Sequence, residues 1–175
     1  MNLKPLIRTI PNYPKEGIMF RDITTLLKHG EGFAYVIDTL AERYRHKGLD
    51  AIMGIEARGF IVGAALAYKL GIGFVPIRKK GKLPGEVYSQ DYELEYGTDC
   101  IEVHHDAVDT DGKVVLIDDL LATGGTALGA IKLIENIGAK VEECAFVIDL
   151  PDLGGRQKIE ATGHQVFTFV EFEGD

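Results

Sequence analysis

Tryptophan is absent from this chain of 175 residues, and cysteine occurs only at Cys100 and Cys144. Two cysteines cannot form a structural zinc site by themselves, and the adjacent His104 and His105 would point to opposite faces of a strand. The most apolar stretch, residues 60–68, ends before a lysine and is too short to span a membrane. A structural zinc protein and a protein anchored by a membrane-spanning helix are therefore excluded.

Positive charge is also scarce. The 19 lysines and arginines are outnumbered by 27 aspartates and glutamates, which gives a net charge of −8. Binding to nucleic acid through its phosphates needs a positive field, so no nucleic-acid partner is expected, and any anionic ligand must meet a local basic patch. Residues 1–17 are broken by three prolines and contain no apolar core of signal-peptide length. We expect a soluble, cytoplasmic protein with reduced thiols and no membrane partner.

Hydrophobic residues make up 46% of the chain, enough for the core of one domain over residues 1–175. Apolar runs alternate with segments of helical periodicity, which predicts an α/β fold with a mostly parallel twisted sheet flanked by helices. Ligands of such folds bind outside the carboxyl ends of the strands. The predicted strands are 51–55, 73–78, 113–118, 140–150 and 165–172, and the predicted helices are 31–47, 59–70 and 125–137.

Residues 79–97 interrupt this alternation. The segment begins with basic residues, passes through Pro84 and Gly85, and ends acidic and rich in tyrosine. Together with residues 101–105 it predicts a β-hairpin on the rim of the sheet. Long polar loops in compact domains are often functional, so a lid over a binding site is the sharper interpretation.

The strongest motif is VVLIDDLLATGGT, residues 114–126. An apolar strand leads into two aspartates, and a turn rich in glycine and threonine then leads into a helix. Backbone N–H groups and two hydroxyls at a helix N-terminus suit a phosphate dianion, and glycine permits its close approach. The lysine of the nucleotide-triphosphatase motif is missing, and no G-x-G-x-x-G is present. The residues that form this predicted 5-phosphate site are Ala122, Thr123, Gly124, Gly125 and Thr126.

Two acids beside a phosphate site would repel a bare polyphosphate. Asp118 and Asp119 make sense if a sugar diol lies next to them, because carboxylates accept hydrogen bonds from hydroxyls and hold the water shell of a divalent metal. The spacing therefore indicates a ribose 5-phosphate. The alternative is a solvated strand end capped by Asp119.

Residues 114–126 resemble the phosphoribosyl diphosphate (PRPP) signature of the type I phosphoribosyltransferases. Four further segments resemble the adenine-specific members of that family and occur in the expected order. They are GIMFRDIT (17–24), IEARGF (55–60), RKKGKLPGE (78–86) and YELEYGTD (92–99). The resemblance implies Mg²⁺-dependent transfer of the phosphoribosyl group from PRPP to adenine, which yields AMP and pyrophosphate. It also implies a homodimer, an N-terminal hood over residues 1–30 that binds the base, and a flexible lid over residues 79–98.

Pyrophosphate is expected to bind where a strand ends and a helix opens at Arg58, whose guanidinium can hold it bidentately. The alternative for Arg58 is an ion pair with Glu56. In the hood, the resemblance implies that Phe20 stacks on the purine while its neighbours frame the edges; composition alone would instead place Phe20 in the core and pair Arg21 with Asp22. The residues expected to contact adenine are Ile18, Met19, Phe20 and Arg21.

The predicted lid carries four cations within five residues, and screening a departing pyrophosphate explains them better than a solvated charge run. Those expected to contact pyrophosphate are Arg78, Lys79 and Lys82, with Lys80 beside them. On the returning arm, the resemblance indicates Glu95 as the general acid or base at the purine ring, and an exposed hairpin glutamate is the alternative. No protein cluster is expected to hold the metal, because Mg²⁺ commonly keeps waters and substrate oxygens as ligands.

Two other functions compete with this interpretation. The same chemistry on a 6-oxopurine fits residues 114–126 equally well, and only segments 17–24 and 92–99 favour adenine. A PRPP-sensing regulator without catalysis is a different class. It would need a nucleic-acid-binding extension or a basic face, and the net charge of −8 disfavours both.

Overall fold

Seven strands form one sheet in the order β5-β6-β4-β3-β7-β8-β9 in the computed structural model, which describes residues 1–94 and 96–174. Strands β3, β4, β7, β8 and β9 run parallel, and β5 and β6 add an antiparallel hairpin at one edge. The predicted α/β class with a mostly parallel sheet is confirmed. The strands are β3 (Ala51–Ile55), β4 (Gly73–Lys79), β5 (Val87–Glu93), β6 (Thr98–His104), β7 (Lys113–Leu121), β8 (Lys140–Asp149) and β9 (Val166–Glu171).

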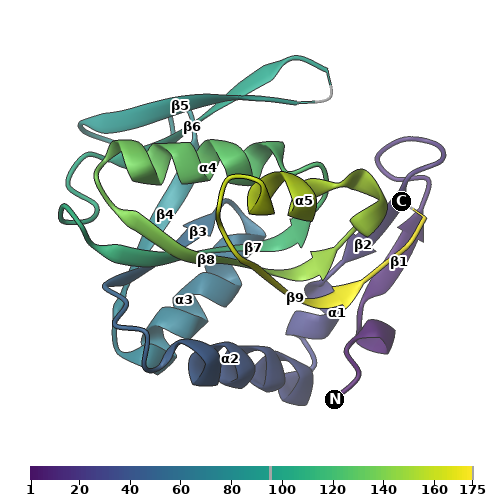
Figure 1. The fold of residues 1–175 in the computed structure, drawn as a ribbon. Helices are drawn as coiled ribbons and strands as arrows, with labels where there is room; N and C mark the ends of the chain where they lie inside the picture. Colours follow the sequence, from purple (N-terminus) through teal and green to yellow (C-terminus); the bar gives the residue numbers. More distant parts are fainter. Residues whose placement is uncertain (95, 175) are drawn as a thin grey trace.

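Helices cover both faces of this sheet. In Figure 1, α2 (Gly30–Tyr44) and α3 (Arg58–Leu70) lie below it, and α4 (Gly125–Asn136) and α5 (Gly155–Glu160) lie above it. The strands feed two cores by alternation: Ile52 of β3 packs on the side of α2 and α3, whereas Met53 packs on the side of α4. Burial on both faces explains why the central strands read as continuous apolar runs.

The strand order reverses between the parallel neighbours β3 and β7. From β3 the chain continues outward to β4, and from the adjacent β7 it continues to β8 on the other side. The carboxyl ends of β3 and β7 therefore flank the crevice in which ligands of open α/β sheets bind. Helix α3 begins directly after β3, and α4 begins directly after β7, so two helix N-termini meet at this point.

Two predicted boundaries were wrong by three residues, and the others differ by at most one. Helix α2 ends at Tyr44 rather than 47, because Tyr44 is its last buried residue and the chain beyond it is exposed. Strand β7 extends past 118 to Leu121, since its pairing with β8 continues to Leu121 and Asp149. Asp118 and Asp119 thus lie inside the strand, whereas Asp118 was predicted to end it and Asp119 to follow it.

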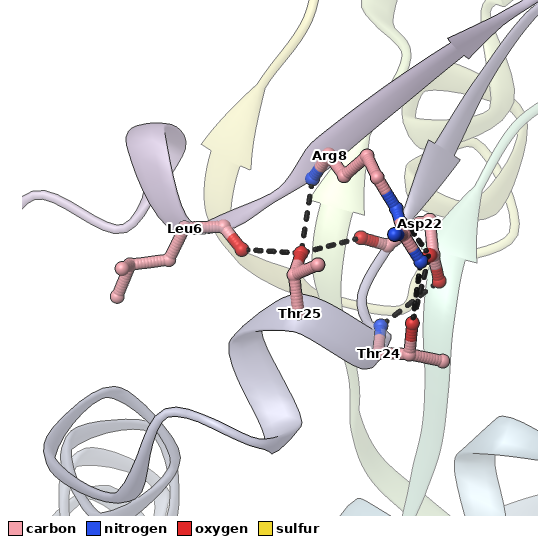
Figure 2. A network of polar contacts seen from close by, with 5 residues as sticks. All are labelled: Leu6, Arg8, Asp22, Thr24 and Thr25. Carbon is pink, nitrogen blue, oxygen red and sulfur yellow. Dashed lines mark hydrogen bonds and ion pairs between the residues drawn. The ribbon is translucent and has the colours of Figure 1, made fainter.

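The hairpin of β1 (Arg8–Pro11) and β2 (Met19–Asp22) was not predicted, because both strands have only four residues and β1 ends on a proline. The hairpin leads into α1 (Thr24–Leu27). Figure 2 shows the contacts that join them: the Asp22 carboxylate accepts hydrogen bonds from the Arg8 guanidinium at 2.5 Å and from the Thr24 amide at 2.9 Å. The Thr25 hydroxyl donates to the Leu6 carbonyl at 2.7 Å. Burial opposes ionisation of Asp22, but the bonds from Arg8 and Thr24 bring its pKa below the ordinary value.

The β5–β6 hairpin confirms the hairpin predicted on the rim. It packs against α4 through Tyr92, which is buried in the core on that side. A methyl group on Gly129 would lie 2.8 Å from Cβ of Tyr92, so glycine is required where the strand crosses the helix. Shorter 3₁₀ turns are η1 (Lys4–Leu6) and η2 (Pro151–Leu153), and sequence analysis missed these and α5.

Candidate active site

A cavity of about 920 Å³ lies at the carboxyl end of β7 and is closed on one side by the β1–β2 hairpin. It brings together three groups that sequence analysis predicted separately: the 5-phosphate residues, the two aspartates and the base-binding segment. The predicted residues that line it are Ile18, Met19, Phe20, Arg21, Arg58, Asp118, Asp119, Ala122, Thr123, Gly124, Gly125 and Thr126.

Residues 122–126, hereafter the phosphate loop, comprise the turn between β7 and α4 and the first two residues of α4. Gly124 has a φ of 89°, a left-handed conformation that favours glycine. No side chain of the described residues caps the first turn of α4. The N–H groups of a first helical turn have no partner within the helix, so the loop offers unpaired donors and the positive end of the helix dipole to a ligand.

The glycines of the phosphate loop also have a packing role that the sequence did not reveal. A methyl group on Gly125 would lie 2.5 Å from the carbonyl oxygen of Glu93 in the β5–β6 hairpin. One on Gly124 would lie 3.1 Å from Cα of Gly155 in α5. The loop is therefore held between two neighbouring elements whose backbones require glycine.

The two aspartates differ in their surroundings. Asp119 is buried, and its Oδ2 lies 2.5 Å from Nε of Arg58. Asp118 is half-buried, opens onto the cavity and accepts a hydrogen bond from the Asp119 amide at 2.8 Å. Removal from bulk water and the charge of Asp119 raise the pKa of Asp118 well above its ordinary value. The site thus holds one carboxylate neutralised by an arginine beside one that resists ionisation.

Arg58 is the first residue of α3 and follows a cis peptide bond between Glu56 and Ala57. Its ion pair with Asp119 shows that the alternative pairing of Arg58 with Glu56 was wrong. The guanidinium also lies over the ring of Phe20, 5.8 Å from its centroid. Arg58 therefore connects the predicted ribose and base subsites.

The predicted lid cations do not line the cavity in this conformation. Lys82 pairs with the Glu56 carboxylate, Arg78 lies 3.4 Å from it, and the Lys79 amide donates to it at 2.9 Å. The Lys79 ammonium instead pairs with Asp99 at 2.7 Å. Burial opposes ionisation of Glu56, but its bonds to Lys82 and Lys79 lower its pKa. These cations are held on carboxylates at the rim of the site.

The predicted base-binding segment lies at the cavity rather than in the core. Phe20 lines the cavity and packs edge-to-face on Tyr13, with ring centroids 5.2 Å apart. Arg21 does not pair with Asp22, whose partner is Arg8. The Arg21 guanidinium instead donates to the Thr9 hydroxyl at 2.7 Å, and its buried Nε has no partner among the described residues.

Other cavity residues escaped sequence analysis. Gly17, Tyr96, Leu120 and Leu121 lie within the segments that resemble the family's motifs, but the resemblance assigned them no role. The other seven lie outside those segments, so no local signal marks them. Glu95, the predicted acid or base, lies outside the described residues, although its neighbour Tyr96 reaches the cavity. The missed lining residues are Pro14, Lys15, Glu16, Gly17, Tyr96, Leu120, Leu121, Ala127, Phe146, Leu150 and Leu153.

A family model described as "phosphoribosyl transferase domain" matches residues 22–172. Because this match covers most of the chain, the chain belongs to the phosphoribosyltransferase family. Within the residues that the structure describes, no helix is long and apolar enough to cross a membrane.

Relatives within this family are adenine phosphoribosyltransferases. That of Methylobacillus flagellatus is 61% identical over 173 residues, which cover 99% of this chain and 98% of the relative. The crystal structure of the Thermoanaerobacter pseudethanolicus enzyme has a TM-score of 0.92 and 49% identity, covering 97% of this chain and 98% of the other. The Saccharomyces cerevisiae enzyme, solved with adenine and an imino-altritol bisphosphate, has a TM-score of 0.89 and 41% identity, covering 96% of both chains.

Proposed function

We propose that the protein transfers the 5-phosphoribosyl group of PRPP to adenine, forming AMP and pyrophosphate in purine salvage. The observation that carries this proposal is the single cavity in which the phosphate loop, two ribose-facing carboxylates and an aromatic base platform meet. The relatives that match this chain over nearly their full length are adenine phosphoribosyltransferases, which supports the choice of adenine.

The phosphate loop anchors the 5-phosphate. Its first-turn N–H groups lie at the N-terminus of α4, where the helix dipole favours a dianion, and the hydroxyls of Thr123 and Thr126, which line the same cavity, are further donors to it in this proposal. Holding the unreactive end of the substrate in this way fixes the distance of its C1 from the base, which lowers the entropic part of the barrier.

Asp118 and Asp119 orient the ribose diol, and Arg58 stabilises pyrophosphate. The pairing of Arg58 with Asp119 has a direct consequence for binding in this proposal. When the ribose hydroxyls reach Asp119, the guanidinium is released from that carboxylate and becomes available to the pyrophosphate oxygens. Binding of PRPP thus exchanges one set of charge-assisted hydrogen bonds for another.

Adenine occupies the space between Phe20 and the phosphate loop. Stacking on an aromatic ring contributes about 1–3 kcal/mol per base. Ile18 and Met19 are partly exposed at the cavity and frame the ring, together with Arg21. The anchoring of the Arg21 guanidinium on Thr9 keeps this segment in place.

Displacement occurs at ribose C1. The bond from C1 to the pyrophosphate oxygen breaks with its electron pair leaving on pyrophosphate, the adenine N9 lone pair bonds to C1, and N9 loses its proton. Glu95 is the proposed acceptor of that proton. In this proposal Arg78, Lys79 and Lys82 leave their carboxylate partners as the lid, residues 79–98, closes over pyrophosphate and excludes water.

Mg²⁺ fits the donor set of the cavity. No group of three or more metal-ligating side chains occurs among the residues described, so the chain itself would supply few ligands. Asp118 and Asp119 can accept hydrogen bonds from its water shell, and substrate oxygens complete such a site. When bound, the metal neutralises charge on the leaving pyrophosphate.

We also propose that the chain forms a homodimer. Ile61 and Tyr68 of α3 are 45% and 89% exposed, which leaves apolar surface on the outer side of this helix. Sedimentation equilibrium should give twice the monomer mass of 19.2 kDa. A single species of 19 kDa would contradict the dimer.

The test of the reaction is pyrophosphate release with PRPP and adenine, run with Mg²⁺ and with excess EDTA. We expect AMP and pyrophosphate in equal amounts with the metal and none with EDTA. PRPP binding without turnover of any purine base would instead assign the protein to the sensor class.

A further inference from the structure

The phosphate loop rests on a part of the chain that does not line the cavity. Helix α5 lies beside α4 and β9 (Figure 1), and its first residue, Gly155, contacts the loop. The Gly155 amide donates to the carbonyl of Ala122 at 3.2 Å. A methyl group on Gly155 would lie 2.5 Å from that oxygen and 3.1 Å from the Gly124 nitrogen. The loop therefore cannot shift toward α5, and a shift of α5 changes the loop.

Arg156 fixes the position of α5. Its Nε donates to Asp149 at 3.2 Å, one terminal nitrogen donates to the Val166 carbonyl at 3.0 Å, and the other donates to the Thr168 hydroxyl at 2.7 Å. The three acceptors come from β8 and β9. A planar guanidinium with acceptors on all three nitrogens is held in one orientation, which a lysine could not reproduce.

The acceptor on β8 strengthens this argument. Asp149 is 1% exposed, so its carboxylate is removed from water and depends on Arg156 for its charge partner. Its other oxygen, Oδ1, is buried and has no hydrogen-bond partner among the described residues. Burying a charged group is costly unless it is paired. A buried ion pair that fixes the short helix α5 therefore suggests that the position of this helix matters for more than packing.

We propose that Arg156 is a positioning residue that acts through Gly155 to hold the phosphate loop in its ligand-binding geometry. This role rests on the proposed function and deepens it: part of the affinity for the 5-phosphate depends on Gly155 and Arg156, which lie outside the cavity. Arg156 touches no substrate; it determines where the loop amides stand.

The experiment measures binding of AMP and adenosine by calorimetry, because these two ligands differ only in the phosphate. We expect Arg156→Met to weaken AMP binding about tenfold or more, as loss of a hydrogen-bonded charge pair does, and to leave adenosine binding within about twofold. Arg156→Lys should fall between the wild type and Arg156→Met. Lys158→Met is the matched control, since it removes an exposed charge from the same helix and should leave both affinities unchanged.

Kinetics provide a second measurement. We expect Arg156→Met to raise KM for PRPP and leave KM for adenine unchanged. Thr168→Val removes only one of the three acceptors and should act in the same direction more weakly, which keeps the test valid if Arg156→Met fails to fold.

Unchanged AMP affinity in Arg156→Met would overturn the proposal. If Arg156→Met does not fold, unchanged AMP affinity in both Arg156→Lys and Thr168→Val would overturn it. Equal losses of AMP and adenosine affinity would do so as well, because they indicate general loosening of the fold. Failure of the proposed function would give a different result, namely no turnover by the wild type. The binding measurements do not depend on turnover, so the two failures can be told apart.

Discussion

The guanidinium of Arg58 and the carboxylate of Asp119, two residues that line the cavity, form an ion pair at 2.5 Å. Sequence analysis assigned these residues to different ligand groups, one to pyrophosphate and the other to ribose. Their pairing neutralises both charges within the site and holds each side chain in place.

Removal of the Arg58 charge should act mainly on catalysis. We expect Arg58→Met to lower kcat by about 100- to 1,000-fold, the usual effect of deleting one group that stabilises developing negative charge. Steady-state kinetics with PRPP and adenine measure this, and Arg45→Met, which removes an exposed arginine from the end of α2, serves as control. A loss confined to KM for adenine would assign Arg58 to the base subsite.

The double change Asp118→Asn with Asp119→Asn should abolish turnover and leave the fold intact, because asparagine preserves the shape of both side chains but removes both carboxyl groups. Pyrophosphate release measures turnover, and circular dichroism verifies the fold. Near-normal activity in the double variant would refute the assignment of the aspartates to the ribose diol.

Phe20→Ala should weaken binding of adenine and AMP by about 1–3 kcal/mol, the contribution of aromatic stacking, and spare PRPP. Calorimetry with each ligand gives the three affinities. An unchanged Kd for adenine would show that Phe20 lines the cavity without contacting the base.

Asp118 should make the folded protein less stable as the pH rises. A carboxyl whose pKa is higher in the folded state than its ordinary 3.8 binds its proton more tightly when folded. Stability is therefore lost as the pH increases from about 3.8 through the raised pKa. Asp118→Asn carries no charge to desolvate, so its melting temperature should exceed that of the wild type at pH 7.5, and the difference should shrink at pH 4. A variant less stable than the wild type at pH 7.5 would contradict this account of Asp118.

Gly125→Ala should displace the β5–β6 hairpin from the phosphate loop, because the new methyl group would meet the Glu93 carbonyl at 2.5 Å. We expect a lower melting temperature, by the equivalent of about 1–3 kcal/mol for overpacking, and a raised KM for PRPP. Gly30→Ala at the start of α2, where a methyl group has open space, is the matched control and should affect neither. Normal KM for PRPP in Gly125→Ala would show that the hairpin does not set the position of the loop.

The parallel core of the fold was predictable because both faces of the sheet are covered. Strands such as β3, buried at all five positions, are visible in sequence as short apolar runs between glycines. The β1–β2 hairpin was not predictable in this way, since its four-residue strands lack alternation and are stabilised by distant contacts such as Arg8 with Asp22.

In the candidate site, too, features within one segment were predictable and contacts between segments were not. Residues 118–126 form one continuous motif whose chemistry depends on spacing, and the structure places them together at the cavity. Pairings between segments were beyond local sequence reasoning: Arg58 reaches Asp119, 61 positions away, rather than Glu56. The roles of Gly124 and Gly125 in packing likewise depend on elements that only the fold brings beside them.

The most direct measurement compares kcat/KM for adenine, hypoxanthine, guanine and xanthine with PRPP and Mg²⁺ in one pyrophosphate-release assay. The account predicts turnover with adenine and none with the three 6-oxopurines. Turnover with a 6-oxopurine in place of adenine would contradict the assigned base, although the phosphate loop and the ribose carboxylates would keep their roles.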